Sequence, residues 1–202
     1  MGKYLKLKID FRGTASSRTL VLPDDWTFAF LHECIQSAFG WLDYHAYTFT
    51  FANGDECLDP DNNWPDVEDP EKEFGHRFFD SDRVPLRKEF KKAGDSVEYE
   101  YDMGDGNQFE IRLLGSTTRP EAACIASTGT DAVEDCAGFG GLSGLIKILK
   151  AGSRSSQYKD AVGWLSEAFG KTPEAVLREP SAGEIDARIR HLVKLVETAR
   201  LR

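Results

Sequence analysis

The spacing of apolar residues changes once along this chain, from every second position to the spacing of a helix. Apolar and polar side chains alternate over residues 5–12, 97–102 and 109–113, as in strands that bury one face. From residue 142 onward, apolar residues recur every three or four positions, which predicts helices over 142–149, 158–169 and 185–196. Strands followed by helices predict an α+β protein.

The N-terminal strands enclose one predicted helix. A second strand over Thr19–Leu22 follows a turn, so the first two strands are expected to form an antiparallel hairpin. Thr27 is a predicted N-cap and Gly40 a predicted left-handed end of the helix between them. A further strand runs to Phe51, and Asn53-Gly54 turns it back. The order strand, strand, helix, strand favours a β-grasp-like mixed sheet under one covering helix.

The chain divides by composition into two parts that we expect to form one structural unit. A β-rich part over 1–115 includes an acidic loop at 59–82, which is predicted to lack regular structure. The second part, 116–202, begins with an irregular Gly-rich stretch that extends to Gly141. Its helices, the last opened by a capping box at Ser181–Glu184, are expected to pack on the sheet.

Charge limits the partners that this chain is expected to bind. The formal net charge is -9, and nine acidic residues lie between Asp55 and Glu73 with Lys72 as the one base. This balance disfavours binding to phosphate backbones, so a protein or small ligand is favoured over nucleic acid. Neither a membrane-spanning apolar run nor an export signal is present in the printed sequence, which predicts a cytoplasmic protein without membrane contact.

The four cysteines do not form a metal-binding motif. Cys124 and Cys136 flank one loop and are weak candidates for zinc ligands, but the usual ligand spacing is missing. Small buried thiols are the favoured interpretation. No cofactor is therefore predicted, and a divalent metal is kept as the alternative.

One set of candidate binding residues surrounds the end of the first helix. His32 and Gln36 are one helical turn apart, and His45 follows the helix near Trp41. Two imidazoles and an amide are expected to converge there. The structural alternative is that Trp41 and His45 stabilise a tight helix-to-strand connection. The predicted binding residues are His32, Gln36, Trp41, His45 and Tyr101.

A second set of candidates consists of carboxylates. Asp102 and Asp105 bracket a glycine turn, and Glu134 and Asp135 open the Gly-rich loop. Four carboxylates that gather could hold a divalent ion or act as a paired acid and base. The alternative is that each aspartate caps its own turn.

Three segments together resemble the plasmid pRiA4b ORF-3-like family. They are Leu31–Trp41 followed by Asp43 and His45, then Tyr99–Gly106, and finally Cys124 with Glu134–Gly141. The resemblance covers roughly residues 3–150. It implies a bacterial origin linked to plasmids or mobile elements and implies no established activity. Asn107 and Phe109 stand where the family usually has Trp and His, so any site that uses that imidazole is absent from this chain.

Two classes of function follow from these observations. The favoured hypothesis is a non-enzymatic interaction or ligand-binding module, in which the acidic loop and the Gly-rich loop recognise a basic partner or small ligand. It is favoured because the sequence contains no complete catalytic set. The alternative is a metal-dependent hydrolase acting on nucleic acid or a nucleotide through the four carboxylates with His32 or His45.

Overall fold

The computed structural model describes residues 3–59, 61, 64–118 and 121–200. Its strands are β1 (Tyr4–Phe11), β2 (Ser17–Pro23), β3 (Tyr47–Thr50), β4 (Glu56–Leu58), β5 (Phe78–Asp80), β6 (Ser96–Tyr101), β7 (Asn107–Thr117) and β8 (Ala123–Thr128). Its α-helices are α1 (Phe28–Phe39), α2 (Pro70–Phe74), α3 (Gly138–Ala151), α4 (Tyr158–Phe169), α5 (Pro173–Leu177) and α6 (Ala182–Arg200). Short 3-10 turns occupy Leu86–Lys88 and Gly152–Arg154. The protein is therefore α+β, as predicted.

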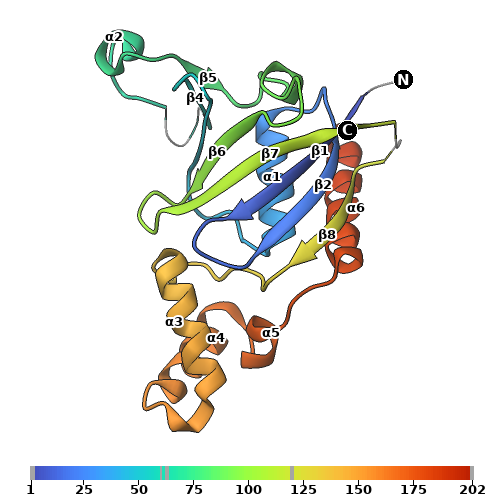
Figure 1. The fold of residues 1–202 in the computed structure, drawn as a ribbon. Coiled ribbons are helices and arrows are strands. Elements are labelled where there is room, and N and C mark those ends of the chain that lie inside the picture. The colour runs from blue at the N-terminus through green and yellow to red at the C-terminus, as the bar shows by residue number, and fades with distance from the viewer. Residues whose placement is uncertain (1–2, 60, 62–63, 119–120, 201–202) are drawn as a thin grey trace.

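All eight strands form one sheet, in the order β5-β4-β3-β6-β7-β1-β2-β8. Neighbouring strands are antiparallel except β4 and β5, which are parallel. In Figure 1, α1 lies across the far face of the sheet with α6 beside it next to β8, while α3, α4 and α5 gather below the sheet. No helix is drawn over the near face, so the described sheet is covered on one side.

The alternating strands and the capped helices were predicted correctly. Leu5, Leu7, Ile9 and Phe11 are all buried on the α1 side of the sheet. The Thr27 side chain accepts a hydrogen bond from Phe30 N–H, and Gly40 ends α1 in the left-handed conformation. The capping box at the start of α6 is present too, because Ser181 and Glu184 bond each other's backbone N–H. In the part of the chain that the structure describes, no helix has the length and apolarity needed to cross a bilayer.

The two segments that were expected to be irregular both contain regular elements. The acidic loop at 59–82 holds α2, capped by Asp69 and ended by Gly75, and β5, which pairs with β4. The stretch from Gly115 to Gly141 holds the end of β7 and all of β8. β8 escapes detection because its sequence, ACIAST, consists mostly of small residues and lacks alternation of apolar and polar positions.

The β-grasp-like detail of the prediction is not confirmed. β1 pairs with β2 on one side and β7 on the other, and both pairings are antiparallel. β8, which follows residue 116, is an edge strand of the same sheet, so the sheet extends beyond the β-rich part of the sequence.

A buried arginine joins the covered face of the sheet to its helices. Arg18 pairs with Ile9 in the β1–β2 register and therefore points into the core, where it is fully buried. Its guanidinium donates to Ala38 O at the end of α1, to Thr128 O at the end of β8, to Thr130 O after it, and to the Asp131 carboxylate. Burial lowers the pKa of Arg18, and Asp131 partly offsets this effect.

Two glycines at the start of α3 are required by close backbone contacts. A Cβ on Gly138 would lie 2.3 Å from Asp105 O, and a Cβ on Gly141 would lie 1.4 Å from Cys136 O. Gly138 also has a φ of +66°, which favours glycine. Gly138 thus allows α3 to begin directly against the β6–β7 turn, and Gly141 leaves room for the backbone just before the helix.

Arg18→Met is expected to lower the free energy of unfolding by about 3–5 kcal/mol, because it leaves several buried carbonyls and Asp131 Oδ1 without their donor, while Arg188 still contacts Asp131 Oδ2. Arg12→Met is the matched control. Arg12 belongs to the same hairpin and pairs with Glu98 at the exposed surface, so its loss should cost less than about 1 kcal/mol. Urea unfolding measures both values, and equal losses would contradict a central role for Arg18.

Candidate functional site

Three connections meet at one end of the sheet and carry most of the predicted site residues. They are the segment between α1 and β3, the turn between β6 and β7, and the segment between β8 and α3. Asp102 accepts hydrogen bonds from Gly104 N–H and Asp105 N–H, which shapes the β6–β7 turn. His45 lies in the first connection and Asp135 in the third, so the fold brings together residues that are distant in the sequence.

His32 is held in a chain of hydrogen bonds under the end of α1. Its Nδ1 lies 2.8 Å from the Tyr99 hydroxyl and its Nε2 lies 2.7 Å from Asp43 Oδ1. Gln36 Nε2 also donates to the Tyr99 hydroxyl. His32 and Gln36, predicted to lie one helical turn apart, thus share the same partner. The ring of His32 stacks on Tyr47, with centroids 3.7 Å apart.

The donors in this chain determine the tautomer of neutral His32. The backbone N–H of Asp43 can only donate a hydrogen bond, so the Gln36 atom that accepts it is the amide oxygen. The amide nitrogen of Gln36 therefore faces Tyr99 and donates to its hydroxyl. The single Tyr99 hydrogen is then directed at His32 Nδ1, and His32 carries its proton on Nε2, facing Asp43. Both ring nitrogens are engaged, so Asp43 presents the negative charge of this pair to solvent.

Tyr101 links the two histidine regions. Its hydroxyl accepts hydrogen bonds from Tyr44 N–H and His45 N–H and donates to Glu134 Oε1, which also accepts from Leu42 N–H. Trp41 packs on the Tyr101 ring. The hydroxyl of Tyr101 therefore stabilises the helix-to-strand connection, which agrees with the structural alternative for this region.

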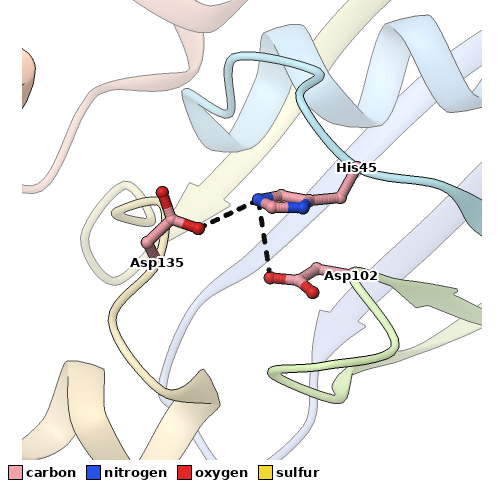
Figure 2. Close-up of side chains that lie close together, drawn as sticks. All are labelled: His45, Asp102 and Asp135. Carbon is pink, nitrogen blue, oxygen red and sulfur yellow. Dashed lines mark hydrogen bonds and ion pairs between the residues drawn. The ribbon is translucent and has the colours of Figure 1, made fainter.

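His45 lies between two carboxylates (Figure 2). Its Nε2 is 3.0 Å from Asp135 Oδ1 and 3.7 Å from Asp102 Oδ2. One ligand atom from each of the three residues lies within 4.8 Å of the others. Asp102 is nearly buried, whereas Asp135 is exposed. The structure therefore brings together two of the four predicted carboxylates with one of the two predicted histidines.

The aspartates that contact the two histidines share an unusual backbone conformation. Asp43, Asp102 and Asp135 have φ values of 58°, 57° and 52°, in the left-handed region that few non-glycine residues adopt. Short polar side chains tolerate this conformation best. The conformation sharply bends each connection.

A cleft of about 830 Å³ opens beside His32 and His45. Its lining includes the apolar side chains Phe30, Leu192 and Val196 from α1 and α6. The carboxylates of its lining are Glu33, Asp43, Asp59, Asp61 and Asp82. No lysine or arginine is found among the described residues that line it. The cleft combines an acidic wall with an apolar one.

Like charges are crowded in this cleft. The pKa of Glu33 is raised, first because burial disfavours the charged carboxylate and then because Asp43 carries the same charge nearby. His32 opposes this shift. A bound cation would relieve the repulsion between Glu33 and Asp43.

Other predicted residues lie outside the His45 group. Asp105 is not one of the three, and its Oδ2 is buried without a hydrogen-bond partner among the described residues. The thiols of Cys124 and Cys136 each bond a nearby carbonyl, and burial raises the pKa of both. Within the described chain, no cluster of three or more potential metal ligands includes either thiol.

The acidic loop at 59–82, predicted to take part in recognition, supplies Asp59, Asp61 and Asp82 to the cleft, whereas sequence reasoning missed Glu33 and Asp43 as lining residues. Asp43 follows the predicted helix end closely, and its place between Gly40 and the next strand was the available signal. Glu33 gave no such signal, because its approach to Asp82 depends on how α1 packs against the segment after β5.

The fold and the site define an α+β protein with a sheet covered on one side and a polar site at one end of that sheet. The chain belongs to the plasmid pRiA4b ORF-3-like family, whose model matches residues 3–176. This confirms the family resemblance.

Two similar proteins carry names that state no activity. The chain is 30% identical over 110 residues to the uncharacterized protein y4hQ of Sinorhizobium fredii (strain NBRC 101917 / NGR234), covering 54% of this chain. It spans 51% of the length of that relative. The crystal structure of MM3350, a protein of unknown function from Methanosarcina mazei Go1, is similar at a TM-score of 0.66 and 27% identity, over 84% of this chain and 93% of that chain.

Glu134→Gln is expected to change how stability depends on pH. Burial raises the pKa of Glu134, so the folded chain favours its protonated form. The corresponding stabilisation is present below pH 4.5, the ordinary pKa of glutamate. It is lost as the pH rises through the raised pKa of Glu134 in the folded chain. The stability of the wild type relative to Glu134→Gln should therefore fall from about pH 4 toward neutrality, as measured by urea unfolding.

Asp55→Asn is the control with the opposite sign. Burial opposes ionisation of Asp55, but hydrogen bonds from Arg77 and Asn53 outweigh it and lower the pKa to about 2. The stability that Asp55 contributes is present above its ordinary value of 3.8 and lost as the pH falls through about 2. A difference between wild type and Glu134→Gln that does not vary with pH would contradict the prediction.

Proposed function

We propose that this protein is a non-enzymatic binding module whose acidic cleft takes an organic cation. The observation that carries the proposal is the cleft of about 830 Å³, which has five carboxylates and neither lysine nor arginine among its described lining residues. Its volume is typical of small-ligand sites. The ligand class is an alkylammonium compound, either free or as part of a basic partner.

The apolar wall supports an organic cation over a bare ion. Phe30, Leu192 and Val196 offer surface for a hydrocarbon chain, while Asp43 and Glu33 attract its charged ends. Burying the chain adds about 25 cal/mol per Å² of apolar surface. The acidic wall disfavours phosphate-bearing ligands, since no lysine or arginine in the described lining would pair with them.

A metal-dependent hydrolase acting on nucleic acid or a nucleotide is the alternative function. The approach of His45 to Asp102 and Asp135 favours it, because three ligands that leave open positions can activate a water molecule. Hydrolysis of bis(p-nitrophenyl) phosphate that requires Mn²⁺ and is lost in Asp135→Asn would favour this alternative over a binding module.

Spermidine is the probe for the acidic cleft. Calorimetric titration at low salt should show binding that weakens as salt screens the carboxylates. The double variant Asp43→Asn with Asp82→Asn should bind about threefold to thirtyfold more weakly, because each exposed ion pair contributes about 0.3–1 kcal/mol. Both substitutions keep the shape of the side chain, and the amide introduced by Asp43→Asn retains an oxygen that accepts from His32.

The matched control removes two acids elsewhere. Asp160 and Glu167 lie exposed on α4, outside the cleft, so Asp160→Asn with Glu167→Gln makes the same change in net charge. This variant should bind spermidine like the wild type. Equal weakening in both double variants would assign the effect to overall charge and overturn the cleft as the binding site.

A further inference from the structure

We propose that His45, Asp102 and Asp135 form a binding site for one divalent transition-metal ion. The three residues come from three separate connections, and Figure 2 shows both carboxylates directed at the same imidazole nitrogen. His45 also lines the cleft, but Asp102 and Asp135 do not, and a metal ion is a different ligand from the organic cation, so either proposal can fail alone.

The distances between the ligand atoms agree with metal coordination. Ligand atoms about 2.1 Å from an ion, at tetrahedral or octahedral angles, are separated by about 3.0–3.4 Å. His45 Nε2 lies 3.0 Å from Asp135 Oδ1 and 3.7 Å from Asp102 Oδ2. The distance to Asp102 exceeds this range by a few tenths of an ångström, and all three ligand atoms lie within 4.8 Å of one another.

The roles of the individual atoms also agree. Asp102 Oδ1 accepts from Gly104 N–H and Asp105 N–H, which orients its Oδ2 toward His45. Such supporting hydrogen bonds are typical of residues that hold metals. On metal binding, the imidazole must carry its proton on Nδ1, so that the Nε2 lone pair is free for the ion.

A buried carboxylate beside the group provides an independent reason for a cation. Glu134 is 1% exposed, and no described residue donates a hydrogen bond to its Oε2. A buried acceptor without a donor is costly. An ion next to His45 would bring positive charge and bound water to this acceptor.

The ligand set selects the class of metal. One imidazole and two carboxylates carry a net charge of about -2, which a divalent ion neutralises. Imidazole favours Zn²⁺ and the later first-row ions over Mn²⁺, whereas Mg²⁺ and Ca²⁺ prefer oxygen ligands alone. We therefore expect affinity to fall in the order Zn²⁺, Co²⁺, Mn²⁺, with Mg²⁺ weakest.

The test is a titration of the chelator-treated full chain with Co²⁺, followed by visible absorption and calorimetry. One Co²⁺ per chain should bind, and Zn²⁺ should displace it. Asp135→Asn should weaken binding more than about tenfold, because even residues that only support metal ligands change affinity about 10- to 100-fold. Asp102→Asn should do the same while its amide oxygen still accepts the two turn hydrogen bonds. Far-UV circular dichroism verifies that each variant is folded.

Glu56→Gln is the control variant. Glu56 lies 3.5 Å from His76, so this pair also joins a histidine to a carboxylate, but no third ligand accompanies it in the described chain. Co²⁺ binding should be unchanged in Glu56→Gln. Absence of saturable Co²⁺ binding, or equal binding by Asp135→Asn and the wild type, would overturn the metal site. Spermidine binding by Asp135→Asn separates this outcome from failure of the acidic cleft.

Discussion

The arrangement of the sheet and helices depends on one buried cation. Arg18 takes its acceptors from the end of α1, from the end of β8 and the residues that follow it, and from Asp131, which Arg188 of α6 also contacts. A guanidinium without partners cannot remain in a core, so these acceptors must be in place together. The same residues determine where the β8–α3 segment runs. Because that segment carries Glu134 and Asp135, the buried arginine indirectly positions the candidate site.

Two tyrosines on one strand organise the polar groups at that end of the sheet. Tyr99 and Tyr101 both point to the covered face of β6, two residues apart. The Tyr99 hydroxyl is hydrogen-bonded to the side chains of His32 and Gln36. The Tyr101 hydroxyl is hydrogen-bonded to the backbone N–H of His45 and to the carboxylate of Glu134. Each histidine thus contacts a buried tyrosine and the carboxylate of an aspartate whose backbone is in the left-handed region. This arrangement explains how two polar clusters can lie close to the core with most of their hydrogen bonds made.

The features that the sequence predicts depend on interactions between residues close together in the chain, whereas the features that it does not predict depend on interactions between residues far apart in the chain. The β1–β2 hairpin, the caps of α1 and the start of α6 depend on neighbouring residues, and periodicity with capping rules is enough to identify them. β8 has no alternation, and its pairing with β2 is long-range. Arg18 lies two residues before Leu20 in β2, so its side chain points to the same buried face as Leu20 and Leu22. The predicted strand began at Thr19 and therefore did not include Arg18. The grouping of His45 with Asp102 and Asp135, rather than with His32, depends on the paths of three loops, which local patterns do not encode.

The late position of β8 in the sequence has a consequence for synthesis of the chain. β2 is completed at Pro23, yet its outer edge has no partner until residues 123–128 leave the ribosome. Three of the groups that accept from Arg18 belong to Thr128, Thr130 and Asp131, so the guanidinium also waits for them. An N-terminal nascent chain therefore carries both an open strand edge and a charge that cannot yet be buried. The open edge exposes it to pairing with other chains, and the uncompensated arginine keeps the early hairpin from closing over its core, so the fold completes only after β8 is available.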